Sequence, residues 1–395
     1  MIVKDEAHII EKTLRNVCSK VPIADWIISD TGSTDGTQDI IKRVFNELNI
    51  PGKLFEDKWE NHGVNRTIAL KQAYENSESD YVFIFDADDS IEGTFVLPED
   101  FGSFDAYFVT LSTAPGFYYK RPALATNKKK WYYLGVLHEF IHADDPRTFG
   151  SIEGDYYIFG GTIGNDAAKY KRDAELIKNE LETNKNIPGH LRSRYLYYLA
   201  QSYKDAGMKK EAIEAYKQRI LKGEQGQEVY ISFFEIGNLY AQDGDPANAI
   251  FYYMQSIQAD NRRVEGICRM MTIFRELGNN AVSHALYRSL DRKVFDVPRN
   301  SDYLFVHKYM YDWQIHYEDT VAAAHYGDFD SRYQFQRIYD HRDQIGNKEI
   351  LKNCAQNLQI YINNVKDLQV KKDLIDLKIK FERLLSEQPS KIVTI

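Results

Sequence analysis

The stretch "WIISDTGSTDGT", residues 26–37, joins a short apolar run to a loop of small, hydroxylated and acidic residues. The apolar run predicts a buried strand that ends at Asp30. Gly32, Ser33 and Gly36 would permit a tight loop into a following helix. In an open α/β sheet, ligands bind beyond the carboxyl ends of the strands. The stretch therefore predicts an α/β sheet with a candidate binding site at Asp30, although a capped turn without a ligand would also explain it.

A second apolar run, in "YVFIFDADDS" at residues 81–90, also ends in carboxylates, those of Asp86, Asp88 and Asp89. Two such strands would place several carboxylates at one edge of the sheet, where their repulsion is costly unless a cation or hydrogen-bond donors compensate it. Oxygen ligands suit Mg²⁺ or Mn²⁺, which usually takes one or two carboxylates and completes its shell with substrate phosphates. We therefore predict a divalent metal cofactor, Mn²⁺ or Mg²⁺, at this edge.

The order of apolar patterns predicts one α/β domain over residues 1–165. In its first part, short β-rich runs alternate with amphipathic segments, which is typical of βαβ units and a mostly parallel sheet. From about 105 to 163, strand-like runs follow one another without a long helix between them. The simplest interpretation is an antiparallel extension of the sheet.

After residue 170 the patterns are helical, and part of the sequence repeats. Small and aromatic residues recur at spacings of 37 residues (Gly207 to Gly244) and 34 residues (Gly244 to Gly278). Such spacings are typical of tetratricopeptide repeats, in which small residues let paired helices approach and aromatic residues fill the gap. We therefore predict a connecting helix over 166–191, repeat helices over 192–295, and further helices over 296–395.

Composition excludes several classes of protein. The formal net charge of −8 over 395 residues argues against a nucleic-acid-binding protein, which needs a basic surface. No apolar run is long enough for a membrane span, and "MIVKDEAHII" at residues 1–10 does not resemble a signal peptide, so we expect a cytoplasmic protein. Cys18, Cys268 and Cys354 are far apart in the sequence and predict reduced thiols.

The three segments "MIVKDEAHI", "DWIISDTGSTDGTQDIIK" and "FIFDADDSI" together resemble the N-terminal signatures of family 2 glycosyltransferases with the GT-A fold. The second segment corresponds to the D-x-G-S-x-D-x-T pattern and the third to the D-x-D motif. A later "LGVLHEFI", followed by a helix and repeats, is similar to a bacterial-type subset with this domain order. The resemblance implies a Rossmann-like GT-A domain with a mixed sheet, followed by an all-α repeat domain.

This resemblance also implies an activity. Members transfer a sugar, of the hexosyl or N-acetylhexosaminyl type, from a nucleotide diphosphate sugar, usually a UDP-sugar, with inversion at the anomeric carbon. Val3 and Lys4 would lie beside the nucleoside, Asp30 would accept a hydrogen bond from the uracil edge, and Asp86 would face the ribose or base. Asp88 would bind the metal that bridges the diphosphate and neutralises the charge of the leaving group. The acceptor stays open between a glycan, a lipid-linked intermediate and a protein.

One further donor contact is suggested by "WENHGVNRTIALKQA". Arg66 matches a position where these enzymes often have an arginine. It would pair with the diphosphate, or it would be an ordinary exposed arginine of a helix.

The catalytic base is expected at Glu139, in the "HE" of the resembling subset. An inverting transfer needs a base that takes the proton of the acceptor, and a carboxylate suits this role. His138 would bind the metal or donate to the leaving phosphate, or it would be structural. Weaker alternatives lie nearby in the sequence: His142, Asp144, Asp145 and Asp166.

Two other functions fit the sequence less well than a glycosyltransferase does. A repeat-based binding or scaffold protein with an inactive α/β half would have no reason to keep Asp30, Asp86 and Asp88 together. A nucleotidyltransferase would need a Gly-rich phosphate loop after the first strand, where this chain has "KDEAHIIEK". The repeats are predicted to pack on the catalytic domain through residues 169–182, and to guide the acceptor or form a homodimer, or only to support the enzyme.

Overall fold

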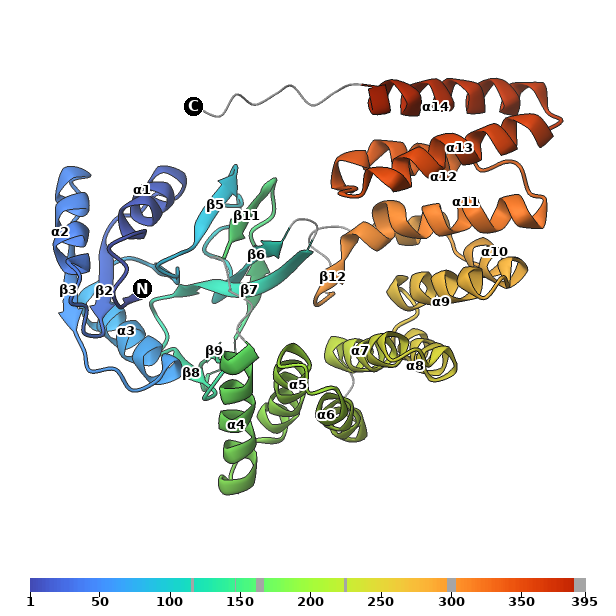
Figure 1. Ribbon diagram of the computed structural model, residues 1–395. Coiled ribbons are helices and arrows are strands. Elements are labelled where there is room, and N and C mark those ends of the chain that lie inside the picture. Colours follow the sequence, from blue (N-terminus) through green and yellow to red (C-terminus); the bar gives the residue numbers. More distant parts are fainter. Residues whose placement is uncertain (115–116, 146, 161–166, 224–225, 297–302, 387–395) are drawn as a thin grey trace. The chain divides into compact units, whose positions relative to one another are not determined.

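The computed structural model describes residues 1–114, 117–145, 147–160, 167–223, 226–296 and 303–386 (Figure 1). The chain forms two compact units. The first comprises residues 1–222 with 299–306, and the second comprises residues 223–298 with 307–395. Each unit is described by itself below. The first pair of repeat helices therefore belongs to the same unit as the sheets, because it contacts the loop that carries Glu139.

The first unit opens with a parallel three-stranded sheet in the order β1-β2-β3. Its strands and the three helices between and after them are β1 (Ile2–Val3), α1 (Ile10–Lys20), β2 (Trp26–Asp30), α2 (Thr37–Glu47), β3 (Gly52–Glu56) and α3 (His62–Asn76). In α1, Ile10, Leu14 and Val17 are buried at helical spacing, so one face of the helix packs on the sheet. The predicted βαβ alternation is confirmed.

A second, seven-stranded sheet is mixed. Its strands are β4 (Tyr81–Phe83), β5 (Ser90–Gly93), β6 (Ala106–Ala114), β7 (Phe117–Thr126), β10 (Phe149–Ser151), β11 (Tyr156–Phe159) and β12 (Val306–His307). The β6–β7 pair is antiparallel, as expected for this region. However, β10 and β11 both run parallel to β6, so the extension is not purely antiparallel. A separate antiparallel pair is formed by β8 (Tyr132–Leu134) and β9 (Phe140–His142).

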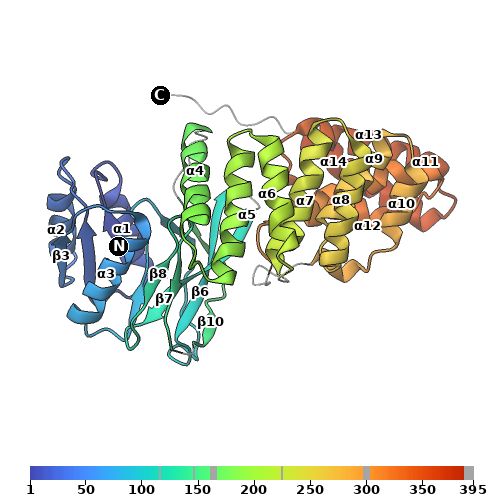
Figure 2. The ribbon, with the colours of Figure 1, turned by 90° about the horizontal axis from the view of Figure 1, so that it is seen from below.

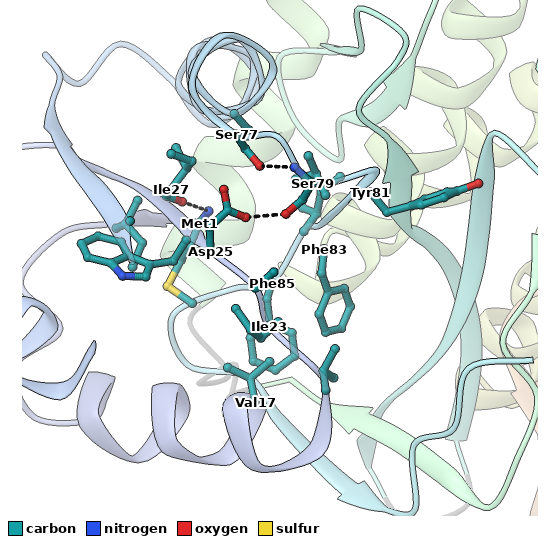
Figure 3. A pocket seen from close by; sticks show the side chains of 18 of the residues that line it. Met1, Val17, Ile23, Asp25, Ile27, Ser77, Ser79, Tyr81, Phe83 and Phe85 are labelled. Carbon is teal, nitrogen blue, oxygen red and sulfur yellow. Dashed lines mark hydrogen bonds between the residues drawn. The ribbon is translucent and has the colours of Figure 1, made fainter. Parts of the chain in front are cut away.

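The strand that precedes Asp86 pairs differently from the simplest expectation. β4 is only three residues long and runs antiparallel to β7, and no βαβ pairing joins it to the first sheet within the described residues. An apolar cavity of about 970 Å³ lies between β2 and β4 (Figure 3). Val17, Ile27, Phe83 and Phe85 are among its lining residues, and Arg66 lies at its wall. The apolar pattern of both strands thus reflects a shared apolar interior.

The remaining described segments are mainly helical, as predicted. In the first unit the helices are α4 (Ala167–Thr183), α5 (Gly189–Asp205) and α6 (Lys209–Leu221). In the second unit they are α7 (Gln227–Gln242), α8 (Pro246–Ala259), α9 (Glu265–Glu276), α10 (Asn280–Arg288), α11 (Ile315–Tyr326), α12 (Arg332–Asp340), α13 (Lys348–Asn364) and α14 (Leu368–Ser386). Figure 2 shows α7, α8, α9 and α10 lying side by side. None of the helices within the described ranges has the length and apolar character needed to cross a bilayer.

The aligned glycines mark equivalent turns. Gly207, Gly244 and Gly278 have φ values of 76°, 73° and 76° and follow the first helix of each pair, α5, α7 and α9. Only glycine adopts this left-handed conformation without cost. A Cβ added at Gly237 would lie 2.6 Å from the ring of Tyr253, which shows how closely α7 and α8 approach. Close approach of paired helices at a small residue is therefore confirmed at Gly237, whereas Gly207, Gly244 and Gly278 form turns and have no neighbour within 4 Å of an added Cβ.

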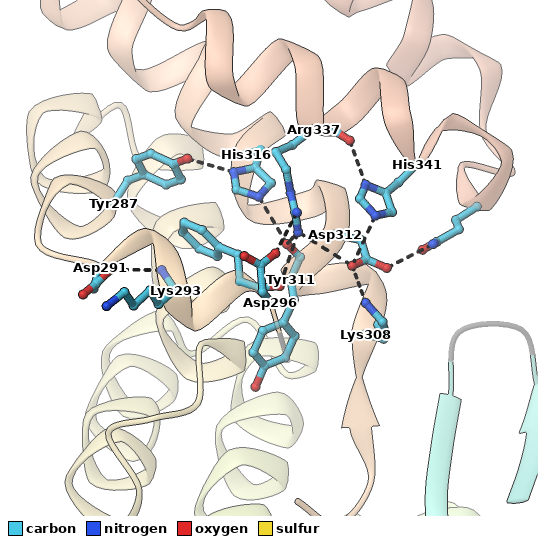
Figure 4. A network of polar contacts seen from close by, with 12 residues as sticks. Tyr287, Asp291, Lys293, Asp296, Lys308, Tyr311, Asp312, His316, Arg337 and His341 are labelled. Atoms are coloured by element: carbon cyan, nitrogen blue, oxygen red, sulfur yellow. Dashed lines mark hydrogen bonds and ion pairs between the residues drawn. The ribbon is translucent and has the colours of Figure 1, made fainter. Parts of the chain in front are cut away.

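The second unit also contains a buried polar network (Figure 4). Asp312, 1% exposed, accepts a hydrogen bond from Lys308 at 2.6 Å and lies 3.6 Å from Nε2 of His341. His316 is fully buried, with Nδ1 2.8 Å from the hydroxyl of Tyr287 and Nε2 3.2 Å from the carbonyl of Tyr311. Both ring nitrogens of His316 thus have a hydrogen-bond partner when the ring is neutral.

Candidate active site

The loop after β2 is organised by Asp30, which is fully buried. Its carboxylate accepts hydrogen bonds from the backbone N–H of Gly32 at 3.2 Å, from that of Ser33 at 3.0 Å, and from Nε2 of Gln38 at 2.7 Å. These three bonds all go to Oδ2, and the N–H of Ser33 also donates to Oδ1 at 3.3 Å, so both oxygens have protein donors. The predicted contact of Asp30 with uracil stays a prediction.

The rest of this loop holds the segment after β1. The backbone N–H of Thr34 donates to Asp5 at 2.8 Å, that of Asp5 donates to Oγ of Ser33 at 2.9 Å, and that of Ala7 donates to Asp35 at 2.9 Å. Sequence reasoning gave no role to Asp5, although an acidic residue two positions after the first strand is a signal for such a contact. The acidic and hydroxylated residues of the loop therefore bind backbone donors of a neighbouring loop.

The two candidate nucleoside residues, Val3 and Lys4, lie at the end of β1 and directly after it. Val3 is 3% exposed, and its carbonyl accepts a hydrogen bond from the backbone N–H of Thr31 at 2.9 Å. Lys4 is exposed and begins the segment after β1 that the loop after β2 contacts. The predicted nucleoside contacts of both residues stay predictions.

The three carboxylates after β4 have different surroundings. Asp88 is exposed, whereas Asp89 is 4% exposed. Burial, followed by the nearby charge of Asp86, raises the pKa of Asp89 to about 7. Burial, followed by the charge of Asp88, raises the pKa of Glu6. The backbone N–H of Asp89 donates to the carbonyl of Asp86 at 3.3 Å, so these two residues share one turn. The predicted gathering of Asp30 with these carboxylates stays a prediction.

Two arginines hold Asp86 from opposite sides. Nη2 of Arg66, on α3, lies 2.7 Å from Oδ1, and Nη1 of Arg121, on β7, lies 3.3 Å from Oδ2. Burial acts to raise the pKa of Asp86, but the two guanidinium groups lower it below the ordinary value. Sequence reasoning missed Arg121. Its signal was a basic residue within the otherwise apolar end of a central strand, "RPALA".

Glu139 joins the same group of charges. Its Oε1 lies 3.1 Å from Nε of Arg66, and only 11% of its side chain is exposed. It stands just before β9, at the end of a bent loop in which Gly135 has a φ of 114°. The structure thus brings Glu139 next to Asp86 through one shared arginine, whereas the sequence placed the two residues 53 positions apart (86 to 139).

His138 is packed rather than directed at the carboxylates. Its ring stacks on Tyr198 with centroids 3.9 Å apart, and its carbonyl accepts hydrogen bonds from Nη2 and Nε of Arg194 at 3.0 and 3.2 Å. Burial, and then the charge of Arg194, lower the pKa of His138 to about 4. These contacts account for a neutral, structural histidine. Its binding of a metal or of the leaving phosphate stays a prediction.

The weaker candidates lie on or beside the β8–β9 pair. His142 contacts Arg147 through Nδ1 at 2.5 Å, and Asp144 accepts a hydrogen bond from the hydroxyl of Tyr132 at 2.6 Å. Asp145 is exposed. Asp166 lies outside the described residues.

The fit of a divalent cation can be judged from the carboxylates. No group of three His, Cys, Asp or Glu side chains in the described part of the chain is arranged to hold a metal. A Mg²⁺ or Mn²⁺ ion bound through one or two carboxylates and two phosphate oxygens needs no such group. Oδ2 of Asp89 is buried without a hydrogen-bond partner, which is an atom that a cation or a donor would satisfy. Asp88 and Asp89 therefore fit a cation that the substrate helps to hold.

Comparisons with known proteins bear on this arrangement. Residues 1–110 match the model of the family described as glycosyl transferase family 2, and residues 230–263 match a tetratricopeptide repeat. No curated protein matches the chain.

Three solved structures illustrate the structural likenesses. The C-terminal part of a TPR repeat-containing protein from Cytophaga hutchinsonii is 13% identical, with 55% of this chain and 75% of that chain covered and a TM-score of 0.36. YrrB, a TPR protein with an unusual peptide-binding site, is 14% identical, with 54% and 98% covered and a TM-score of 0.35. S. aureus TarS 1–349 is 14% identical, with 66% and 90% covered and a TM-score of 0.33.

All three TM-scores lie below 0.5, so these likenesses say nothing about the function of this chain. The family model and the repeat model match parts of the chain that the structure shows as sheet and as paired helices. The chain therefore carries a glycosyl transferase family 2 domain at residues 1–110 and a tetratricopeptide repeat at residues 230–263.

Proposed function

We propose that this glycosyltransferase moves a hexosyl or N-acetylhexosaminyl group from a UDP-sugar to an acceptor, with inversion and with a divalent cation. The observation that carries the proposal is the gathering of Glu139, Asp86 and Asp89 around two arginines in the domain that matches family 2, with the exposed Asp88 next to Asp89 in the sequence. A base and a group of carboxylates suited to a cation are the two parts that such a transfer needs.

Glu139 acts as the base in this proposal. It takes the proton of the acceptor hydroxyl while that oxygen attacks the anomeric carbon. The bond between that carbon and the diphosphate breaks, and the nucleoside diphosphate leaves with the electron pair. Because this is one displacement, the configuration at the anomeric carbon inverts.

The donor is held by the loops at the ends of β1, β2 and β4. Val3, Lys4 and Asp30 would bind the nucleoside, and Asp86 would face the ribose. Asp88, with Asp89, would hold Mn²⁺ or Mg²⁺, which neutralises the charge that develops on the diphosphate. A direct contact of Arg66 with the diphosphate is not part of the proposal, because its guanidinium already has two carboxylate partners.

The acceptor and the repeats complete the proposal. The acceptor is a glycan, a lipid-linked intermediate or a protein, and the repeats guide it or join two copies of the chain. Tetratricopeptide arrays offer extended surfaces that suit such binding. On α8, the side chains of Phe251 and Met254 are 52% and 55% exposed, so apolar contact area is available on the second unit.

A thermal-shift screen tests the proposed donor. The chain would be melted with a panel of nucleotide sugars, with and without Mn²⁺, because a ligand that binds only the folded state raises the melting temperature by mass action. We expect a shift with UDP-sugars that grows when Mn²⁺ is present. Absence of a shift with every nucleotide sugar would instead favour a repeat protein whose α/β domain is inactive.

A further inference from the structure

Charged side chains alternate in sign along a row through the site. The row runs from Glu139 to Arg66, Asp86, Arg121 and Asp89. Successive members lie 3.1, 2.7, 3.3 and 3.8 Å apart, measured between nitrogen and oxygen atoms. Arg66 is the member that connects the proposed base to the carboxylates of the proposed donor site.

The first three members are shielded from solvent. The exposed fractions of the side chains are 11% for Glu139, 16% for Arg66 and 23% for Asp86. A charge in such a setting needs a partner, because the cost of removing it from water is large. Arg66 supplies this partner to both carboxylates at once, so its loss would remove the ion pair of Glu139 and leave Asp86 paired with Arg121.

Arg66 and Glu139 are close, but the N–H of Arg66 Nε does not point at the Glu139 oxygen. Nε of Arg66 lies 3.1 Å from Oε1 of Glu139, yet this buried nitrogen has no hydrogen bond of acceptable angle. Hydrogen bonds between catalytic groups are often poorly aligned without substrate and tighten in the complex. A small rotation of the Glu139 carboxylate would complete this bond.

The backbone around the pair is held on the α3 side. Asn61 caps α3 by accepting a hydrogen bond from the backbone N–H of Val64 at 2.9 Å. Oγ1 of Thr67, one residue after Arg66, accepts a hydrogen bond from the backbone N–H of Tyr133 at 2.9 Å. The helix that carries Arg66 is thus fixed to the β8–β9 pair beside Glu139.

A tight backbone approach completes this support. A Cβ added at Gly63 would lie 2.7 Å from the carbonyl oxygen of Gly135 and 3.8 Å from Cβ of Glu139. The first turn of α3 therefore touches the loop of Glu139 directly, and this closeness fixes the distance over which Arg66 acts.

We propose that Arg66 is a positioning residue. By pairing with both Glu139 and Asp86, it holds the base at a fixed position relative to the bound donor. This inference rests on the proposed function, in which Glu139 is the base and Asp86 lies at the donor site. Arg66 acts through its two ion pairs and touches neither the acceptor nor the reacting carbon.

Arg121 offers a matched control. It also pairs with Asp86 and is a guanidinium in the same row, but its other neighbour is Asp89 rather than Glu139. Loss of either arginine removes one cation from Asp86. Only loss of Arg66 should change the behaviour of Glu139.

The experiment measures release of UDP from the best UDP-sugar of the thermal-shift panel, with Mn²⁺ and with water as the acceptor. The variants are Arg66→Ala, Arg121→Ala, Glu139→Gln and each arginine variant combined with Glu139→Gln. We expect Arg66→Ala to lower kcat by at least about 30-fold with a donor KM within about threefold, as for an interaction used in the transition state. Combined with Glu139→Gln it should cost no more than Glu139→Gln alone, whereas the effects of Arg121→Ala and Glu139→Gln should multiply.

Two further readouts separate positioning from loss of structure. Added guanidinium ion should restore part of the kcat of Arg66→Ala and should not restore that of Glu139→Gln. Hydrogen exchange of the backbone amides at residues 136–141 should speed up in Arg66→Ala and stay unchanged in Arg121→Ala.

The outcomes distinguish the inference from the proposed function. If wild-type chain releases no UDP from any UDP-sugar, the proposed function fails, and the exchange of residues 136–141 still decides whether Arg66 positions the loop. If Glu139→Gln lowers kcat but the Arg66→Ala effect multiplies with it, or appears only in the donor KM, Arg66 binds the donor directly and the inference is overturned. Unchanged exchange in Arg66→Ala would also overturn it.

Discussion

At the scale of single residues, Glu139 carries the most specific claim. The change Glu139→Gln keeps the shape and the contact with Arg66 but removes the ability to take a proton. We expect turnover to fall by about 10² to 10⁴, the usual contribution of general-base catalysis. Binding of UDP, measured by calorimetry, should change little. Wild-type turnover in the variant would transfer the role to another acid, with Asp144 and Asp145 the first to test.

A second residue-scale prediction concerns His316 and pH. Burial, and then Arg337, lower the pKa of His316 to about 3, against an ordinary value of 6.5. Between these values the unfolded chain binds a proton that the folded chain does not. The free energy of unfolding should therefore fall as pH drops from about 6.5 toward 3, by at most about 1.4 kcal/mol per pH unit from this group.

Urea unfolding followed by circular dichroism between pH 4 and 8 checks this slope. His316→Gln should remove the contribution, because an amide does not titrate. His325→Gln is the control, since His325 lies on the same helix, α11, and is exposed. An equal slope in wild type and His316→Gln would contradict the assignment.

The sequence predicted the types of site residue better than their partners. Asp86, Asp88 and Asp89 follow an apolar run, and this pattern alone placed them at a sheet edge. Arg121 was missed because its partners are 32 and 35 positions away (121 to 89 and 121 to 86), in the segment between β4 and β5. Pairing between distant side chains depends on which segments the fold brings together, and the local sequence around Arg121 does not show this.

At the scale of elements, α5 supports the loop of Glu139. The hydroxyl of Tyr195 accepts a hydrogen bond from the backbone N–H of Val136 at 2.9 Å, and Arg194 donates to the carbonyl of His138. The first repeat helix therefore fixes the loop opposite to α3. This role was not predicted, because the sequence grouped α5 with the repeats rather than with the sheets.

Tyr195→Phe tests this support. It leaves the N–H of Val136 without its partner, and an unsatisfied backbone donor of this kind costs about 1–3 kcal/mol. We expect lower thermal stability, faster hydrogen exchange at residues 135–139, and reduced turnover. Tyr203→Phe on the same helix is the control, since no hydrogen bond joins its hydroxyl to a described residue. Equal exchange in the two variants would show that the loop does not depend on α5.

The end of β4 was predicted wrongly from the apolar pattern. The run "YVFIF" predicted a strand to residue 85, whereas β4 ends at Phe83 and pairs with β7 in antiparallel fashion. The apolar pattern reflects burial, and Phe85 is buried beyond the strand's end. By contrast, the repeat spacing of Gly207, Gly244 and Gly278 was found from the sequence, and the structure shows that all three form turns, where a left-handed conformation after a helix favours glycine.

At the scale of the whole molecule, the division into units changes how the repeats can be removed. A chain cut after residue 190 loses α5 and its contacts with residues 136 and 138, whereas a chain cut after residue 222 keeps them. If α5 supports the site, the longer fragment should release UDP from a UDP-sugar faster than the shorter one. The measurements are UDP binding by calorimetry and the rate of UDP release, made on both fragments. A melting transition first shows that each fragment is folded.

Measurements on the same fragments test the proposed roles of the later repeats. Guidance of an acceptor or formation of a homodimer predicts that the longer fragment keeps release of UDP with water but loses sugar transfer or self-association. Equal UDP release by both fragments would show that α5 has no effect on the site.

The central claim is inverting transfer at a site that uses Asp88 and a cation, and NMR of the sugar released from a UDP-α-sugar in the presence of Mg²⁺ tests it most directly. We predict that the β-anomer appears first, before it equilibrates in water. Release should stop on addition of a chelator and in Asp88→Asn, while the melting temperature of the unliganded chain stays within a few degrees of wild type. Release of the α-anomer, or full turnover with chelator present, would contradict the account.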